Sequence, residues 1–281
     1  ITFSVRIGMA LAESDLIDAD RFIRDAEMAL MIAKESAVPL ANYDERARDE
    51  VVARRQMVRD MRDAIRNDEF FVEYQPIMEL ATGRTVGVEG LARWRRADGE
   101  LVPPGLFIPL AEETGMIMAI TRRVFTTALS QLAAWDRSGV ALRELRMSLN
   151  LTPRVLDARE LVPWLSELLR KDTLDPARLT LELTESALAS APSTVVSKIT
   201  ELRDVGLKIS LDDFGTGYST FNRLLELPVS ELKIDRSFTQ SIGGPHRAIV
   251  PGVIRLARDS GLAVVAEGIE TAEQLAVLLA D

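Results

Sequence analysis

The chain has 281 residues, 47% of them hydrophobic, which suffices for one large α/β barrel with a smaller piece or for two ordinary domains. Its formal net charge of −9 argues against a protein that grips nucleic-acid backbone or anionic lipid, because those surfaces favour clustered Lys and Arg. The absence of Cys excludes disulfides and thiolate zinc sites and is compatible with a reducing cytoplasm, and the single His, His246, excludes histidine-rich metal sites.

The first 67 residues predict a small α/β segment followed by a connecting helix. Residues 2–10 are strand-like, and apolar side chains recur at helical spacing over residues 19–34. Residues 45–67 mix both charge signs along a helix-compatible run, which indicates a connecting helix and a domain boundary. No apolar run is long enough to span a bilayer, and the first residues lack the layout of a signal peptide. Since the chain begins in strand-like sequence without a Met, we expect a piece of a longer protein.

From residue 68 to residue 281, short β-prone runs alternate with helical stretches. The runs are FFVEY, TVGVEGL, LRMSLNL, RLTLELT, LKISLDD, ELKID and LAVVAEG, and each except the first is followed by a helix-like segment. Such alternation predicts a parallel α/β sheet, and seven strands over this length favour a TIM-like (βα)₈ barrel. No G-x-G-x-x-G follows the first strand to support a dinucleotide fold. The eighth strand is expected to be missing at the C-terminal end.

Polar residues share one face of these predicted strands, near the strand ends. In LELT, for example, Leu181 and Leu183 fall on the face opposite Glu182 and Thr184. In a barrel the apolar face packs on the helices and the polar face points inward, and active sites are built at the C-terminal strand ends. The polar strand-end residues are Glu89, Asn150, Glu182, Asp212, Asp213, Lys233, Asp235 and Glu267.

A set dominated by carboxylates repels itself unless cations neutralise it. Ligands that are all oxygen select magnesium, manganese or calcium, and a pair of such ions can stabilise both oxygens of an in-line displacement at phosphorus. The residues therefore predict metal-dependent hydrolysis of a phosphodiester. Three roles stay open for Lys233: orienting the attacking water, helping to deprotonate it, or neutralising local charge.

Eight short motifs follow one another in the order found in a known family. They are YQPI at 74–77, EGLARW at 89–94, FIPLAEETG at 107–115, LNLT at 149–152, LELTES at 181–186, DDFGTGYST at 212–220, LKIDRSF at 232–238 and AEGIET at 266–271. Together they resemble the motif series of EAL-domain phosphodiesterases, which linearise the bacterial messenger cyclic di-GMP. The resemblance covers the chain from about residue 70 to its end.

The resemblance implies a role for each matching residue. One metal would be held by Glu89, Asn150, Glu182 and Asp212, and the second by Asp212, Asp213 and Glu267. The catalytic group would comprise Lys233, which contacts the nucleophilic water, together with Glu267 and with Glu185, which steadies the loop that contains Gly215 and Gly217. Substrate contacts would come from Gln75, Leu91 and Arg93, with Asp235 and Glu270 as further candidates. Two divalent cations, Mg²⁺ or Mn²⁺, are the expected cofactors, and Ca²⁺ is expected to inhibit because it takes more ligands at longer distances.

Two departures from the family pattern matter, and the N-terminal residues show a second resemblance. Gly90 stands where the signature has Ala, on the face opposite Glu89, so we expect only a small packing effect. The family's final strand, with a glutamine near the substrate, is absent from this chain. Residues 1–44 are similar to the closing part of a GGDEF domain but lack its signature and nucleotide-binding half, so no cyclase activity is expected.

The predicted function is hydrolysis of cyclic di-GMP to linear pGpG. The alternatives are a catalytically inactive cyclic di-GMP receptor or interaction module, and a metal-dependent barrel that acts on another phosphodiester. Cyclic di-GMP is the expected partner, with no DNA, no RNA and no membrane segment in this chain, while a homodimer is left open. A cytoplasmic location is expected, although a segment outside this chain could tether the whole protein to a membrane.

Overall fold

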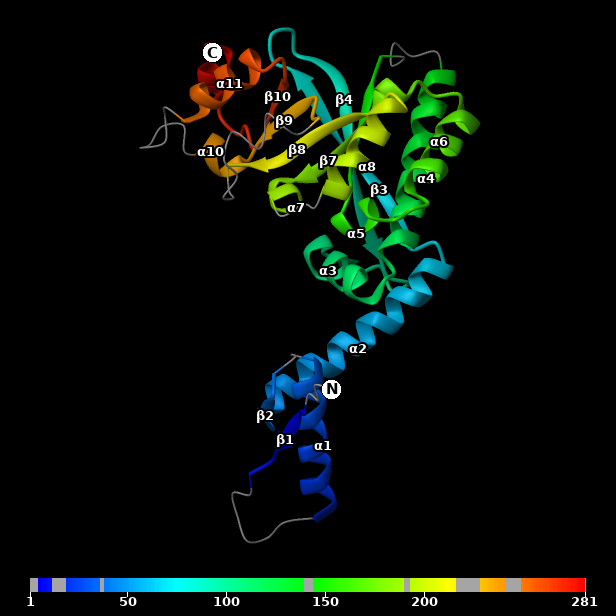
Figure 1. The fold of residues 1–281 in the computed structure, drawn as a ribbon, viewed down its shortest axis with the longest axis vertical. Helices are drawn as coiled ribbons and strands as arrows, with labels where there is room; N and C mark the ends of the chain where they lie inside the picture. Colours follow the sequence, from blue (N-terminus) through cyan, green and yellow to red (C-terminus); the bar gives the residue numbers. More distant parts are fainter. Residues whose placement is uncertain are drawn as a thin grey trace. The chain divides into compact units, whose positions relative to one another are not determined.

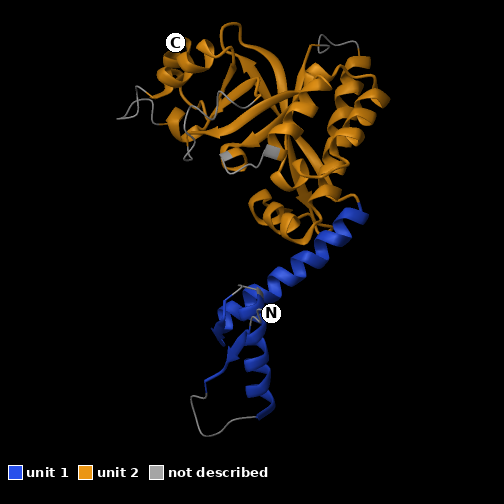
Figure 2. Ribbon diagram, in the orientation of Figure 1, with its two compact units in different colours: residues 1–67 blue, residues 68–281 orange. Residues whose placement is uncertain are grey.

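A computed structural model describes residues 5–11, 19–35, 38–138, 144–189, 193–215, 228–240 and 249–280. It divides into two compact units, residues 1–67 and residues 68–281, which are coloured separately in Figure 2.

The N-terminal unit packs a two-stranded parallel sheet on a helix. Strands β1 (Ile7–Met9) and β2 (Leu40–Asn42) pair, and α1 (Ala19–Glu35) lies between them in the chain. Gly8 lets β1 approach α1 closely, because a Cβ at this position would lie 2.0 Å from the backbone nitrogen of Leu30. The sequence predicted β1 and α1, but β1 is shorter than residues 2–10, of which 2–4 lie outside the described residues. It missed β2, whose three residues are too few to show a pattern.

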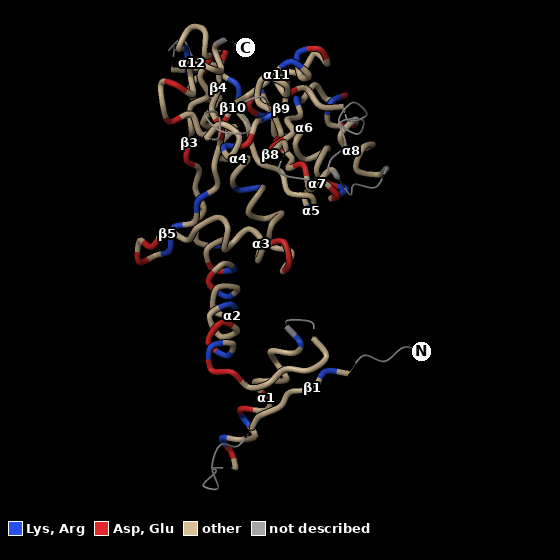
Figure 3. The backbone as a smooth tube through the Cα atoms, turned by 90° about the vertical axis from the view of Figure 1, so that its left-hand side faces the viewer, with Lys and Arg blue, Asp and Glu red and all other residues tan. Residues whose placement is uncertain are grey.

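The helix predicted for residues 45–67 is α2 (Glu45–Arg66). Asp44 caps it, because its side chain accepts a hydrogen bond of 2.9 Å from the backbone nitrogen of Arg46. Both charge signs recur along the helix, as Figure 3 shows, and only Val51, Met61 and Ala64 are buried among its side chains.

The second unit is built on a curled α/β sheet (Figure 1). Its strands are β3 (Phe70–Glu79), β4 (Arg84–Arg95), β5 (Leu101–Val102), β6 (Arg146–Asn150), β7 (Leu179–Thr184), β8 (Lys208–Phe214), β9 (Glu231–Ile234) and β10 (Ala263–Ala266). Their order is β10-β9-β8-β7-β6-β4-β3, with β5 paired to β4. The strands from β4 to β10 on this path run parallel, which confirms the predicted TIM-like α/β class.

The first strand of the sheet is the exception to the parallel arrangement that the alternation predicts. β3 pairs antiparallel to β4, from Phe70 opposite Trp94 to Glu79 opposite Arg84. The physical reason is the connection, because residues 80–83 are too few for the crossover that a parallel pair requires, and Gly83 supplies a turn residue with φ of 68°. Within the described residues β3 and β10 are the two ends of the strand path and do not pair with each other.

Helices flank this sheet (Figure 1). They are α3 (Pro104–Thr114), α4 (Ile117–Arg137), α5 (Pro153–Leu156), α6 (Leu161–Asp172), α7 (Glu185–Ala189), α8 (Ser193–Asp204), α10 (Arg236–Gln240), α11 (Ile249–Asp259) and α12 (Ala272–Ala280), with a 3₁₀ turn η1 (Pro176–Arg178). The predicted apolar strand face is buried, since Leu149, Leu181 and Ile209 are each 0% exposed. None of the described helices is long and apolar enough to cross a membrane.

Candidate active site

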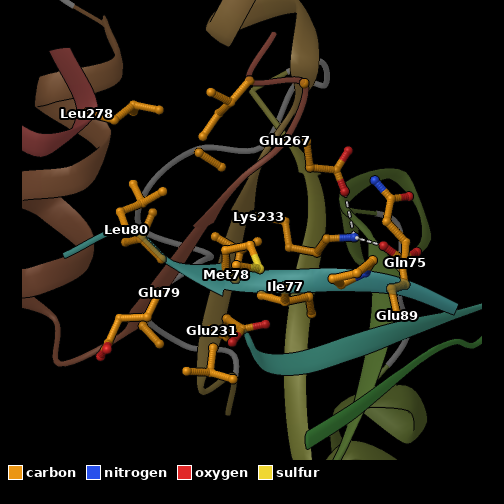
Figure 4. A pocket seen from close by; sticks show the side chains of 18 of the residues that line it. Gln75, Ile77, Met78, Glu79, Leu80, Glu89, Glu231, Lys233, Glu267 and Leu278 are labelled. Carbon is orange, nitrogen blue, oxygen red and sulfur yellow. Dashed lines mark hydrogen bonds and ion pairs between the residues drawn. The ribbon is translucent and has the colours of Figure 1, made fainter. Parts of the chain in front are cut away.

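The carboxylates predicted from the strand ends converge on the ammonium of Lys233, and Figure 4 shows Glu89 and Glu267 beside it. Its Nζ lies 2.6 Å from Glu267 Oε1, 2.9 Å from Glu182 Oε2, 3.3 Å from Glu89 Oε2 and 3.4 Å from Asp212 Oδ1. Lys233 is 2% exposed. One buried cation therefore contacts four carboxylates that come from four other parts of the sheet.

The sheet register explains why these side chains meet. Glu89 lies on β4, Glu182 on β7, Asp212 on β8 and Lys233 on β9, and Glu267 follows β10 directly. Glu182, Asp212 and Lys233 occupy the polar phase toward the C-terminal ends of their parallel strands, Glu89 has the same phase in the part of β4 that pairs with β6, and Glu267 continues from the end of β10. The strand alternation thus brings together residues that are far apart in the chain.

Burial and charge act in opposite directions on the two central groups. Desolvation raises the pKa of Glu182 to about 8, although Lys233 acts to lower it. Burial alone would lower the pKa of Lys233, but the carboxylates of Glu182, Asp212 and Glu89 outweigh it and raise this pKa above its ordinary range. Desolvation also raises the pKa of Glu267. The geometry therefore favours a charged lysine in a crowded carboxylate cluster.

Asp212 and Asp213 lie in an irregularity of β8, where the register with β9 shifts between Leu211 and Phe214. Strict alternation would send Asp213 to the opposite face, but its φ of 55° breaks the alternation, and its backbone nitrogen donates to Asp212 Oδ1 at 2.9 Å. The pKa of Asp213 is raised by desolvation and next by Asp212. The two neighbouring aspartates can therefore contribute to the same site.

The donor set suits a hard divalent cation. The Asn150 amide nitrogen donates to Glu89 Oε1 at 2.9 Å, so the amide oxygen of Asn150 is not used in this contact. Among the residues that the structure describes, Glu182 Oε1 has no hydrogen-bond partner although it is buried, as expected of an oxygen that binds another ligand. The carboxylates are arranged around Lys233, and in the described part of the chain no three acidic or histidine side chains are already positioned to hold an ion. The oxygen donors of the cluster fit a divalent cation, whereas in this structure the ammonium of Lys233 lies at the centre of the cluster.

Glu185 contacts the loop that follows β8. It opens α7, is 2% exposed, and its Oε2 accepts a hydrogen bond of 2.8 Å from the backbone nitrogen of Gly215, whose φ is 97°. The contact joins Glu185 to the residues directly after the two aspartates. The remainder of that loop, including Gly217, lies outside the described residues, as does His246.

We expect Glu185→Ala to accelerate amide hydrogen exchange at Gly215 by about tenfold or more. A hydrogen bond to a charged group contributes ~1.5–3 kcal/mol, so its loss should ease local opening of this segment. Glu185→Gln keeps an acceptor oxygen and should have a smaller effect, while Glu201→Ala on the exposed face of α8 is the control. Unchanged exchange at Gly215 in the alanine variant would show that Glu185 does not hold the loop.

A cavity of about 1170 Å³ opens beside the cluster. Of the predicted substrate contacts, Gln75, Leu91 and Glu270 line it, together with Glu89, Lys233 and Glu267, and Figure 4 shows Gln75 close to Glu89. Gln75 stands directly opposite Glu89 in the antiparallel pair of β3 and β4.

Two predicted substrate contacts do not line this cavity. Arg93 forms an ion pair of 2.6 Å with Glu73 and also donates to the carbonyl of Ala92. Asp235 accepts a hydrogen bond of 3.0 Å from the backbone nitrogen of Ser237 at the start of α10, and the pKa of Asp235 is lowered because the Ser237 hydroxyl and backbone outweigh its desolvation. The structure therefore gives both residues local partners.

Three further cavity residues were not predicted from the sequence, and strand alternation could have found two of them, Arg146 and Glu231. Arg146, Glu231 and Arg236 line the cavity, and Arg146 lies 3.8 Å from Glu231. Glu231 precedes Lys233 by two positions on β9, so it shares the inward phase. The signal was present, but these residues lie at strand starts or after a strand, where no site was expected.

At Gly90, next to Glu89, neighbouring side chains leave little room for a side chain. A Cβ at this position would lie 2.6 Å from Leu149 Cδ2 and 3.3 Å from Val72 Cγ1. The obstructing atoms are ends of apolar side chains, which can shift, so the geometry agrees with a small packing effect rather than a loss of the site.

The EAL domain family matches residues 58–280, which is most of the chain. The chain belongs to the EAL family. Among its EAL relatives, the probable cyclic di-GMP phosphodiesterase PdeB of Escherichia coli K12 is 38% identical over 214 residues, covering 76% of this chain and 40% of that protein. The bifunctional diguanylate cyclase/cyclic di-GMP phosphodiesterase MucR of Pseudomonas aeruginosa is 34% identical over 278 residues, covering 98% of this chain and 40% of that protein.

A solved EAL structure has the same fold. The PaMucR phosphodiesterase in its c-di-GMP complex superposes with a TM-score of 0.75 at 36% identity, covering 80% of this chain and 91% of that chain. This EAL chain spans only a third to about a half of the length of the first curated relatives that it matches.

Proposed function

We propose that this chain is a metal-dependent phosphodiesterase that hydrolyses cyclic di-GMP to linear pGpG. The observation that carries the proposal is the convergence of four carboxylates, a lysine and an asparagine at one end of the sheet, beside a cavity lined by Gln75 and Leu91. The names of the phosphodiesterase relatives and the cyclic di-GMP complex of PaMucR support the choice of substrate.

Two divalent cations, Mg²⁺ or Mn²⁺, are the proposed cofactors. Their ligands would be Glu89, Asn150, Glu182 and Asp212 for one, and Asp212, Asp213 and Glu267 for the other. When bound, the ions would supply positive charge to the phosphate and to the attacking and leaving oxygens.

The side chains of this chain would bind and orient the reactants. Lys233, as an ammonium, can donate a hydrogen bond to the water that attacks phosphorus and so fix its position. Gln75, Leu91 and Glu270 would contact the nucleotide in the cavity. Arg93 lies two residues after Leu91 on β4 and on the same face. To bind a phosphate, Arg93 would release Glu73, its ion-pair partner in this structure. Asp235 remains a proposed contact next to α10.

The further parts of the proposal concern the surroundings of the site. We propose that residues 1–44 are a remnant of a GGDEF-like domain, that residues 45–67 connect it to the barrel over 68–281, and that the protein is cytoplasmic and able to form a homodimer. The bifunctional relative MucR, which matches 98% of this chain, supports the first of these.

A product assay tests the proposed function. The whole protein, freed of metals with a chelator and resupplied with Mg²⁺, is incubated with cyclic di-GMP, and the products are separated by chromatography. We expect pGpG, and none when the chelator stays in excess. Tight binding of cyclic di-GMP without turnover would identify a receptor instead, and turnover of other phosphodiesters in preference to cyclic di-GMP would identify another substrate class.

A further inference from the structure

Lys233 is the shared ion-pair partner of the whole carboxylate cluster. Its Nζ contacts Glu267, Glu182, Glu89 and Asp212 at 2.6–3.4 Å. In the described part of the chain, no other basic side chain lies within ion-pair distance of these four carboxylates. The four acids therefore depend on one cation for their local neutralisation.

Because the centre of the cluster is buried, the acids depend strongly on the charge of Lys233. Lys233 is 2% exposed and Glu182 is 1% exposed, so water screens their charges poorly. The cluster also joins β4, β7, β8, β9 and the segment after β10, so repulsion among the acids would act on the curvature of the sheet itself.

We propose that Lys233 is a built-in counter-ion that holds the ligand carboxylates together and competes with divalent cations for them. The inference rests on the metal ligands of the proposed function, and it adds a positioning role for Lys233 that is separate from its contact with the attacking water. If so, the ammonium of Lys233 stabilises the fold when divalent ions are absent, and it weakens the binding of divalent ions to these carboxylates.

Removal of the ammonium should therefore have two opposite effects. Lys233→Met keeps an unbranched apolar stem of similar length but leaves four acids, of which Glu182 and Asp212 are buried, without their counter-ion. Without divalent ions we expect its Tm to fall by at least about 5 °C relative to the wild type. The same variant should bind Mg²⁺ at least about tenfold more tightly, because the cation no longer shares its ligands with an ammonium.

The experiment uses the full chain and Mg²⁺ itself as the probe. Thermal unfolding is followed in excess chelator and across a Mg²⁺ titration, and Mg²⁺ affinity is measured by calorimetry. Lys198→Met is the matched control, because Lys198 forms a single ion pair of 3.2 Å with Glu201 on α8 and lies outside the cluster. Lys198→Met should leave both quantities near their wild-type values.

Two more variants keep the test decisive if Lys233→Met folds poorly. Lys233→Arg retains the positive charge and should recover most of the Tm in chelator. Lys233→Met combined with Glu182→Gln removes one acid along with the lysine, and it should recover at least half of the Tm lost in the single variant.

The outcomes separate this inference from the proposed function. If pGpG forms in the wild type while Lys233→Met keeps wild-type Tm in chelator and wild-type Mg²⁺ affinity, the counter-ion role is wrong and the phosphodiesterase assignment stands. Failure of Lys233→Arg and of the double variant to recover Tm would also overturn the counter-ion role. A lower Tm in chelator with tighter Mg²⁺ binding, recovered as described, supports it whether or not pGpG forms.

Discussion

Glu89→Ala should lower the turnover of cyclic di-GMP by more than tenfold, equivalent to about 1.4 kcal/mol in the barrier, while the protein stays folded. The side chain of Glu89 is a proposed ligand, and it also accepts the amide of Asn150 at 2.9 Å and contacts Lys233 at 3.3 Å. Its removal therefore takes one donor from the site and frees Asn150 from its partner. The sheet should survive, because the buried neighbour Val88 is untouched.

The measurement for this variant pairs initial rates with thermal unfolding. Glu100→Ala is the control, since Glu100 lies in the exposed turn before β5, where it pairs with Arg96 at 2.8 Å. It should keep the wild-type rate. A folded Glu89→Ala protein with more than about a tenth of the wild-type rate would show that Glu89 is not a metal ligand.

Exchange of the divalent ion should have an equally large effect. Mg²⁺ and Mn²⁺ suit compact octahedral shells of oxygen, with Mg²⁺ ligands at about 2.0–2.1 Å, whereas Ca²⁺ takes more ligands at about 2.3–2.6 Å. Asp212 is proposed to serve both ions, so a larger ion should alter the spacing on which an in-line displacement depends. We expect turnover with Mg²⁺ or Mn²⁺, and with Ca²⁺ binding of cyclic di-GMP but little hydrolysis.

Parallel binding and product assays after chelator treatment test this expectation. Ca²⁺ added to the Mg²⁺-loaded protein should reduce the rate by competition, and excess Mg²⁺ should restore it. Full activity without divalent ions, or equal rates in Ca²⁺ and Mg²⁺, would contradict the two-ion mechanism.

Strand alternation predicted much of the site. It assigned Glu182 and Lys233 to the inward face, and both are buried at the strand ends where they meet. This worked because a period of two residues fixes the face of every side chain once the apolar face is known.

The details of strand pairing could not be predicted from the sequence. The hairpin of β3 and β4 places Glu73 near Arg93, so a residue expected to contact substrate has a carboxylate partner of its own. The turn of Asp213 into the left-handed region is equally invisible in the sequence, because the preceding Asp212 shows the ordinary alternation of a strand. Neither the direction of a strand nor a break in its register follows from local composition.

The hairpin also bears on the order in which the site is assembled. Gln75 lies opposite Glu89 in the hairpin, and residues 80–83 alone connect the two strands. This part of the site therefore needs only a short loop to close. Lys233 and Glu89 are 144 residues apart, and their contact requires most of the second unit to be in place. Contacts of long sequence separation carry the larger entropic cost and tend to form late. We therefore expect the hairpin to be ordered early in folding and the charge cluster to close last, so that substitutions in the cluster speed unfolding more than they slow folding.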